Sequence, residues 1–236
     1  MLHSLCGIIK GMKTRTKLKD RKLPDYTKGE EIFNMVSHIV GAAFAVPILV
    51  LCVIRGAIEY GAAGVLTGLA FSISMLTLFT MSAIYHGLNP KVRAKKVMQI
   101  IDHCSIFLLI AGSYTPVTLI ALMKTEPVTA WVMFSVVWAM SILGIVLNSI
   151  DLKKFESFSM ACYLALGWCI ILCLPNLMAI LPPIGTVLLI LGGVMYTVGA
   201  MFFGLEKEFR YMHSVFHLLV LGGSICHGLM ILLCIL

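Results

Sequence analysis

Charged residues are scarce in this sequence. Of its 236 residues, 12% are Asp, Glu, Lys or Arg and 60% are hydrophobic, whereas a soluble globular domain has about 25% charged residues. This composition excludes an ordinary water-soluble fold. The sequence also lacks an internal repeat or a low-complexity linker, so we expect one membrane domain, at 31–236, preceded by a basic cytoplasmic arm at 1–30.

Two further patterns are missing. The apolar segments show no alternation of apolar and polar residues, which disfavours a membrane β-barrel. The eight cysteines form no Cys-x-x-Cys pair, and almost all of them lie within apolar segments. We therefore interpret the cysteines as small core residues rather than as a disulfide framework or a metal site.

Long apolar segments fill most of the remaining sequence. A hydrocarbon core about 30 Å thick is crossed by a helix of about 20 residues. The predicted spans are 32–54, 63–86, 98–122, 128–148, 157–175, 184–204 and 212–236. They predict an all-α integral membrane protein, specifically a bundle of seven transmembrane helices in the cell membrane.

The basic residues are distributed unequally among the connections between these spans. Sixteen of the 18 lie before residue 31 or in the second, fourth and sixth connections, and only Arg55 and Lys124 lie in the others. Because Lys and Arg accumulate in cytoplasmic loops, this distribution predicts a cytoplasmic N-terminus and a C-terminus outside. It also accounts for the net charge of +7 without a nucleic-acid partner, since the arm is expected near anionic lipid headgroups.

Ionisable side chains inside membrane helices are costly unless they are paired, so each one indicates function by default. Here they gather in the first, second, third and last predicted spans. They are Glu31, His38, His86, Asp102, His103, His213, His217 and His227, with Asn34 beside them. In the predicted orientation all except His227 fall at the cytoplasmic leaflet, so we expect segments distant in sequence to meet at one depth.

The spacing of the last histidines indicates a metal site. His213 and His217 are four residues apart, on one helix face, where two imidazoles can reach one metal. Three neutral histidines with one position left for water are typical of catalytic zinc. We therefore expect His86, His213 and His217 to bind Zn²⁺, with Asp102 holding or deprotonating the water. Hydrogen bonding between helices is the alternative role for these histidines.

Two histidines fit that site less well. His103 follows Asp102 directly and projects about 100° away from it on a helix, so we interpret it as packing near the site. His227 lies 14 residues beyond His213, roughly 21 Å of helix rise, which is too far to share a metal. We expect His227 to be a hydrogen-bonded interior histidine.

Four motifs in these segments form a recognisable set. They are Glu31-x-x-Asn34-x-x-x-His38, Ser82-Ala83-Ile84-Tyr85-His86, Ile101-Asp102-His103 followed by Ala111-Gly112-Ser113-Tyr114-Thr115-Pro116, and His213-Ser214-Val215-Phe216-His217 followed by His227. From about Glu31 to the end, the sequence resembles the hemolysin III family, the bacterial branch of the progestin and adipoQ receptors. That superfamily is related more distantly to alkaline ceramidases.

The resemblance implies a role for each matching residue. The zinc ligands would be His86, His213 and His217. Asp102 would meet the metal through water, and Ser82 would support catalysis as a hydrogen-bond donor. Three residues would support the site without binding metal: Glu31, Asn34 and His38.

The sequence leaves three functions open. The first is a zinc-dependent hydrolase of an amide or ester bond in a membrane lipid, similar to a ceramidase. The second is a receptor or membrane-homeostasis sensor in which zinc only fixes the helices. The third is a hemolysin or pore-former, which needs a polar path across the whole membrane. The gathering of ionisable groups at one leaflet counts against the pore-former, and the hydrolase is the leading interpretation.

Overall fold

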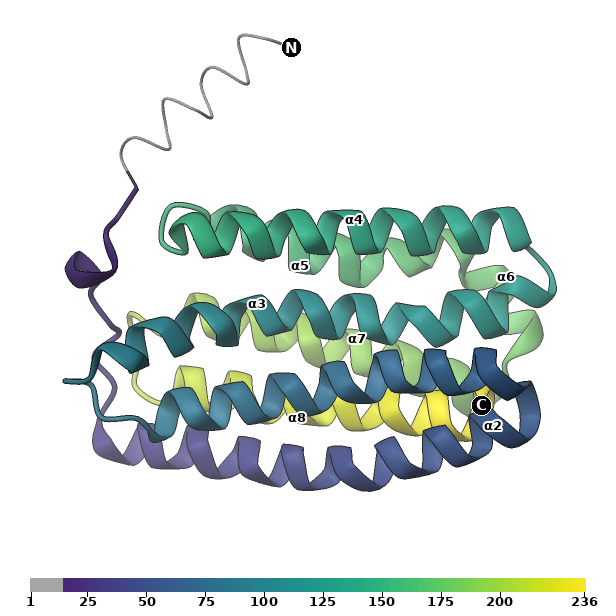
Figure 1. Ribbon diagram of the computed structural model, residues 1–236, viewed down its shortest axis with the longest axis horizontal. Coiled ribbons are helices and arrows are strands. Elements are labelled where there is room, and N and C mark those ends of the chain that lie inside the picture. The colour runs from purple at the N-terminus through teal and green to yellow at the C-terminus, as the bar shows by residue number, and fades with distance from the viewer. Residues whose placement is uncertain (1–14) are drawn as a thin grey trace, which may run out of the picture.

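The computed structural model describes residues 15–236, and those residues form only helices and short connections (Figure 1). The α-helices are α2 (Lys28–Gly87), α3 (Arg93–Pro116), α4 (Pro127–Asp151), α5 (Glu156–Trp168), α6 (Leu174–Ile180), α7 (Pro183–Gly204) and α8 (Met212–Met230). Short 3-10 or π segments accompany them: η1 (Leu18–Asp20), η2 (Val117–Ala121), η3 (Leu122–Lys124), η4 (Cys169–Cys173) and η5 (Ile231–Ile235). The predicted all-α class is therefore confirmed for the described part of the chain.

Six continuous helical stretches within residues 15–236 are long and apolar enough to cross a membrane. They are Lys28–Gly87, Arg93–Lys124, Pro127–Asp151, Glu156–Ile180, Pro183–Gly204 and Met212–Ile235. Five of them enclose one predicted span each, apart from the final residue of the chain, and the first encloses two. Proline at the first turn helps to start α4 and α7, because proline has no N–H to leave unpaired there.

The first stretch, α2, reverses direction within its 60 residues. Gly61 has φ 58° and ψ −136°, a conformation that a residue with a Cβ rarely adopts. On either side of it the backbones touch, since a Cβ added to Gly56 would lie 2.6 Å from the carbonyl carbon of Gly64. Figure 1 shows the two arms of α2 side by side, and they correspond to the predicted spans 32–54 and 63–86.

The start of α2 lies earlier than the predicted domain boundary at residue 31. Thr27 caps the helix, since its hydroxyl accepts a hydrogen bond from the Glu30 backbone N–H at 3.2 Å and its own N–H donates to the Glu30 carboxylate at 2.7 Å. The Glu30 carboxylate also accepts a hydrogen bond from the backbone N–H of Tyr211, just before α8. Residues 15–27 contact the bundle, and the rest of the predicted arm, 1–14, lies outside the described residues.

Apolar side chains form both the interior and much of the surface. Phe71, Phe79 and Phe107 are completely buried, whereas Val128 and Leu172 are 76% and 80% exposed. A surface of this kind suits lipid, since soluble proteins rarely expose large apolar patches. Within the bundle α3 packs between α2 and α4, and α8 packs against α2 and α7.

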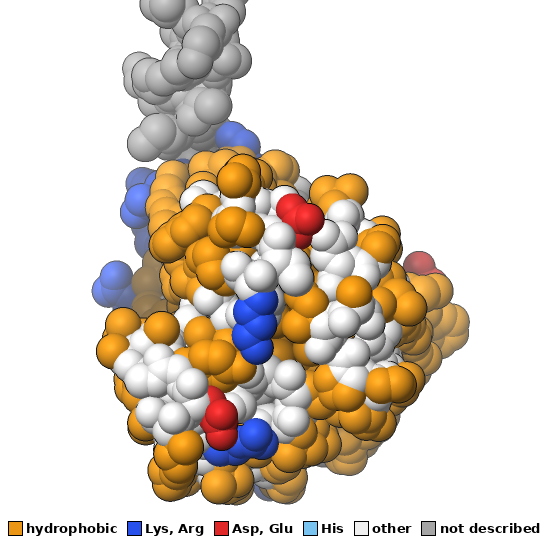
Figure 2. Space-filling model, turned by 90° about the vertical axis from the view of Figure 1, so that its right-hand side faces the viewer, with side chains coloured by type: hydrophobic (Ala, Val, Ile, Leu, Met, Phe, Trp, Pro, Cys, Tyr) orange, Lys and Arg blue, Asp and Glu red, His pale blue; other side chains and the backbone are white. Residues whose placement is uncertain are grey.

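The bundle has two ends of different composition. At one end, here called the histidine end, α2 finishes with His86 and α8 starts beside His213. The other, here called the reversal end, contains the reversal of α2 at Gly61 and the C-terminus (Figure 1). Figure 2 shows the reversal end, where hydrophobic side chains surround a few isolated charged ones.

Candidate functional site

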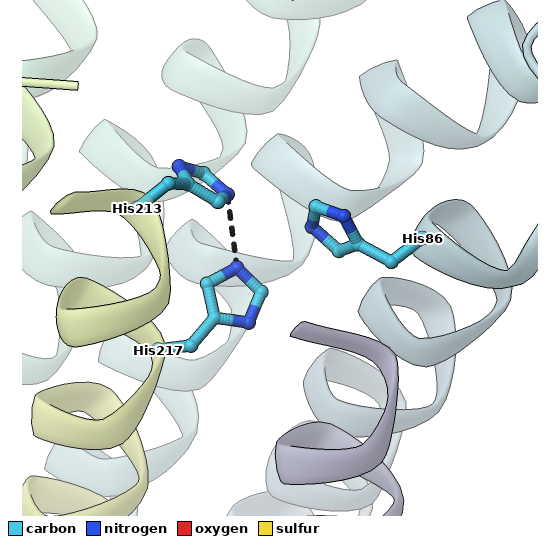
Figure 3. Close-up of side chains that lie close together, drawn as sticks. All are labelled: His86, His213 and His217. Carbon is cyan, nitrogen blue, oxygen red and sulfur yellow. Dashed lines mark hydrogen bonds between the residues drawn. The ribbon is translucent and has the colours of Figure 1, made fainter. Parts of the chain in front are cut away.

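Three buried histidines converge at the histidine end. His86 comes from the end of α2, and His213 and His217 come from the first two turns of α8. One ring nitrogen from each lies within 4.8 Å of those of the other two. The Nε2 atoms of His213 and His217 are 2.9 Å apart, and the His86 ring faces them from the other side (Figure 3).

Two carboxylates hold the outer nitrogens of this cluster. His86 Nδ1 lies 2.7 Å from Glu31 Oε2, and His213 Nδ1 lies 2.6 Å from Glu206 Oε2. Because a carboxylate only accepts hydrogen bonds, each of these Nδ1 atoms carries the proton, and each Nε2 keeps its lone pair. The His86 Nε2 atom is buried and has no hydrogen-bond partner among the described residues.

This arrangement fits a zinc ion. Zinc–nitrogen distances of about 2.0–2.1 Å with tetrahedral angles separate two ligand nitrogens by about 3.3 Å, which lies between the 2.9 Å contact and the 4.8 Å limit of the cluster. Histidines that bind metals usually donate their other N–H to a carboxylate or carbonyl, as His86 and His213 do here. A buried lone pair without a donor, at His86 Nε2, is what a cation would satisfy.

A buried lysine fixes the first of the two carboxylates. Lys95, in the first turn of α3, is 1% exposed and donates to Glu31 Oε1 at 2.6 Å. Its ammonium also donates to the backbone carbonyl of Leu88 at 3.0 Å. The Glu31 carboxylate thus bridges an ammonium and an imidazole, which sets the orientation of the His86 ring.

A tyrosine fixes the second carboxylate. Tyr26 donates its hydroxyl proton to Glu206 Oε2 at 2.8 Å, and its ring centroid lies 4.8 Å from that of His213. Burial, followed by the negative charge of Glu206, raises the pKa of Tyr26, which keeps the hydroxyl protonated. Burial alone would raise the pKa of Glu206, but hydrogen bonds from His213 and Tyr26 outweigh it and hold that pKa below its usual range.

The other two polar residues at the start of α2 also lie against α8. The Asn34 side-chain oxygen accepts a hydrogen bond from Ser214 Oγ at 2.7 Å, which ties α2 to α8 next to His213. The His38 ring packs on that of His217, with centroids 3.8 Å apart. Of the three residues expected to support the site, only Glu31 hydrogen-bonds a candidate ligand. Asn34 hydrogen-bonds Ser214, a neighbour of His213, and His38 packs against His217.

The two residues expected to take part in catalysis line the same cavity as the histidines. Asp102 and Ser82 are 9% and 1% exposed, and both border an apolar cavity of about 130 Å³. That cavity also touches His213 and His217 and extends between α3, α5, α7 and α8. Asp102 lies outside the group of three histidines whose nitrogens are within 4.8 Å of one another, so it faces the cavity rather than completing the ligand set.

The two remaining histidines lie outside that group. His103 Nδ1 contacts the carbonyl of Gln99, one turn earlier in α3, at 2.9 Å. His227 Nε2 contacts the carbonyl of Leu189 in α7 at 3.2 Å, and the His227 ring packs edge-on against Tyr196. Both border the apolar cavity, so they contribute polar groups to its wall.

Three residues of the site are absent from the sequence predictions. Tyr26 and Glu206 lie in connections, and Lys95 is one of four basic residues in the connection that leads into α3. The predicted span that begins at residue 98 leaves Lys95 in the connection, whereas α3 begins at Arg93 and includes it. For Tyr26 and Glu206 no local pattern distinguishes them from neighbouring polar residues.

Comparison with known proteins agrees with the motifs. The family model described as "Haemolysin-III related" matches residues 26–228. The chain belongs to the haemolysin-III related family. It is 37% identical to Hemolysin-3 of Bacillus cereus over 196 residues, which cover 83% of this chain and 87% of that protein. It is 38% identical to the Hemolysin-3 homolog of Bacillus subtilis (strain 168) over 200 residues, 84% of this chain and 91% of the relative.

Membership of the haemolysin-III related family confirms the family expected from the four motifs. Together with the apolar helices, it makes the chain a multi-pass membrane protein. The match begins at residue 26 and therefore includes Tyr26, the whole of α2 and every candidate or supporting residue on α2 and α8. The family name itself assigns no chemistry to the three histidines.

Proposed function

We propose that this protein is a zinc-dependent hydrolase of an amide or ester bond in a membrane lipid, similar in reaction class to a ceramidase. The observation that carries the proposal is the position of two histidines of the cluster: His213 and His217 border an apolar cavity whose wall also contains Asp102 and Ser82. The apolar wall suits the part of an acyl chain next to the scissile bond, which would lie beside the histidines. The substrate partner is therefore a membrane lipid, and we propose no nucleic-acid partner.

The residues divide the reaction between them. His86, His213 and His217 would hold the zinc ion, which when bound lowers the pKa of water toward neutrality and polarises a carbonyl. Asp102 accepts the proton of the attacking water and passes it to the leaving oxygen or nitrogen as the carbonyl carbon loses that bond. Ser82 donates a hydrogen bond toward the carbonyl oxygen, where negative charge develops.

The proposed topology places this chemistry at the cytoplasmic leaflet. We propose seven crossings, with each arm of α2 counted as one, because Gly61 breaks the helix and the two arms lie side by side. The basic connections then lie in the cytoplasm and Leu236 lies outside. A reporter fused after Leu236 should be external and one inserted beside Lys91 cytoplasmic; the opposite pattern would refute this topology.

A zinc staple in a receptor or sensor is the second candidate function. This function is favoured by the hydrogen bonds around the histidines, which involve residues of several segments. They join the N-terminal segment, α2, α3 and α8 at one place, as a structural metal site would. The two functions place different demands on Asp102. A staple needs only ligands, whereas hydrolysis needs a base that can accept a proton.

The substitution Asp102→Asn separates the two functions. Asn cannot accept the proton, and loss of a general base typically lowers the rate about 10²–10⁴-fold, so the variant should keep zinc and lose turnover. The measurement is release of free fatty acid from a panel of lipid amides and esters in nanodiscs, alongside zinc content. Glu59→Gln is the control, since that carboxylate is exposed and lies outside the cavity that contains Asp102.

Two outcomes would count against the hydrolase. Zinc-loaded wild type that releases no fatty acid above a metal-free sample from any lipid would favour the staple. Equal release by wild type and Asp102→Asn would remove Asp102 from its proposed role and leave the base unassigned.

A further inference from the structure

A second, polar cavity lies at the histidine end. It has a volume of about 700 Å³ and is bordered by residues of 16–26, by the connection between α4 and α5, and by the connection between α7 and α8. Its wall shares His103, Leu152, Glu156 and Phe203 with the apolar cavity, so the two are adjacent. We call this second cavity the polar chamber.

One cation in the wall of the polar chamber has a buried donor without a partner. Arg21 is 9% exposed, and its Nη1 atom is buried without a hydrogen-bond partner among residues 15–236. A buried charged group that is not paired is strongly unfavourable, and removal of an unpaired donor from water costs free energy that a ligand can return. An arginine presents several donors in a planar fork that matches a phosphate.

Five basic and six acidic residues border the chamber, so the charge of a ligand depends on which of them lack a partner. Lys22 and Lys153 also border the chamber, and neither forms an ion pair with the described residues. Asp20 and Glu208 border it too and carry the opposite charge. Among these residues without an ion pair, only Arg21 is buried, whereas Lys22, Lys153, Asp20 and Glu208 are exposed to solvent. The charge that most needs a partner is therefore the positive charge of Arg21, which calls for an anionic ligand.

Most of the remaining acids at the chamber already have partners. Glu156 lies 2.9 Å from Lys207 Nζ, and Glu206 is held by Tyr26 and His213. Glu30 accepts hydrogen bonds from Thr27 and Tyr211 and lies 3.6 Å from Arg210. None of these three carboxylates is therefore left to pair with Arg21.

Asp151, at the end of α4, is a further buried acid near the N-terminal segment. Its carboxylate accepts hydrogen bonds from the backbone N–H groups of Thr16 and Lys154, at 2.7 and 3.3 Å. It forms no ion pair with Arg21. Asp151 is therefore bonded to backbone groups and does not satisfy Arg21 Nη1.

We propose that the polar chamber binds the phosphate group of a membrane lipid, with Arg21 as the main donor and Lys22 and Lys153 beside it. This inference rests on the proposed function, because it assigns the acyl chain to the apolar cavity and the headgroup to the chamber. The bond between chain and headgroup then falls where the cavities adjoin, at the level of His103, next to Asp102. The substrate class is thus a phosphate-bearing lipid rather than a neutral one.

Binding of matched lipids tests the proposal. Dioleoyl phosphatidic acid and dioleoylglycerol have the same chains and differ by the phosphate, and inorganic phosphate provides the headgroup alone. Apparent dissociation constants are measured from thermal-shift titrations in detergent, with the Asp102→Asn protein so that no ligand is consumed. We expect phosphatidic acid to bind at least tenfold more tightly than dioleoylglycerol, and inorganic phosphate much more weakly than phosphatidic acid.

Substitutions at Arg21 then identify the donor. Arg21→Gln should weaken phosphatidic acid binding about ten- to hundred-fold, the loss expected for hydrogen bonds to a charged group, and leave dioleoylglycerol unchanged. Arg21→Lys keeps the positive charge but lacks the planar set of guanidinium donors, so we expect a smaller loss of affinity for phosphatidic acid than in Arg21→Gln. Arg93→Gln is the matched control, since Arg93 is exposed at the start of α3 and lies outside both cavities.

Equal dissociation constants for phosphatidic acid with and without the Arg21→Gln substitution would overturn the proposal, as would equal binding of the two lipids. Inorganic phosphate that binds as tightly as phosphatidic acid would refute the lipid source. If Arg21→Gln fails to fold, the proposal is still tested by the comparison of the two lipids on the Asp102→Asn protein and by the affinity of Arg21→Lys for phosphatidic acid. A protein that fails every turnover assay but binds phosphatidic acid through Arg21 would lose the proposed function and keep this headgroup site.

Discussion

Different kinds of interaction hold the helices together at the two ends of the bundle. At the reversal end, the backbones of Gly56 and Gly64 touch, and Arg55 donates to the carbonyl of Leu232 at 2.7 Å. At the histidine end, partly buried carboxylates, buried imidazoles and a buried ammonium form a connected network that includes Glu31 and Lys95. Both ends close the bundle, but only the histidine end uses several buried ionisable groups to do so.

This difference bears on the proposed role of the polar network. In a bilayer the burial of apolar surface does not drive helices together, so close packing and hydrogen bonds must do it. The reversal end achieves closure with small residues and a few hydrogen bonds. The carboxylate-supported histidines therefore exceed what closure requires, and chemistry is the better explanation for them.

Among substitutions that test this difference between the two ends, removal of a candidate zinc ligand at the histidine end should have the largest effect. His213→Ala should lower zinc affinity by more than about 100-fold, because loss of a ligand exceeds the 10–100-fold typical for loss of a ligand's supporting partner. His227→Ala, on the same helix but outside the cluster, should leave zinc in place. Zinc per chain is measured by elemental analysis of purified protein. Zinc loss in His227→Ala but not in His213→Ala would show that the ligands are misassigned.

Weakening the support of a ligand should have an intermediate effect. Glu206→Gln leaves a neutral amide beside His213 Nδ1, so we expect zinc affinity to fall about 10–100-fold. Glu59→Gln, an exposed change near the reversal end, is the control. Affinity is measured by competition with a zinc chelator. An unchanged affinity in Glu206→Gln would mean that the carboxylate does not orient the ligand.

A change at the reversal end should affect stability and leave the metal site intact. Gly61→Ala places a Cβ where φ is 58°, which should destabilise the fold by about 1–3 kcal/mol. Gly204→Ala also meets open space but has no positive φ, so it should be nearly neutral. Thermal unfolding in detergent and zinc content are measured for both. If Gly61→Ala is as stable as Gly204→Ala, the reversal does not depend on glycine at that position.

The sequence predicts the helices well because each apolar run must satisfy its own backbone within the membrane. The predicted spans 98–122 and 184–204 lie within Arg93–Lys124 and Pro183–Gly204. The sequence could not predict that helix continues on both sides of Gly61 without a separate loop, because this depends on how closely the two arms of α2 pack against each other. The start of α2 at Lys28 was also missed, because its cap lies among basic residues expected to be part of the arm.

The sequence predicts those residues of the candidate site that are close together in the chain or lie at the end of an apolar segment. His213 and His217 share a face because they are one turn apart, and His86 joins them through its position at the end of a span. Glu206, Lys95 and Tyr26 could not be found in this way. Their roles depend on which connection meets which helix, and that is decided by packing between elements rather than by neighbours in sequence.

The division of the histidines between α2 and α8 also has a consequence for biogenesis. His86 leaves the ribosome on the order of ten seconds before His213, at about 5–20 residues per second. During that interval the nascent chain exposes only one of the three imidazoles to the metal pool. For the proposed zinc site, complete coordination would therefore be possible only after the last helix is inserted, and metal uptake would report that synthesis and assembly of the bundle are finished.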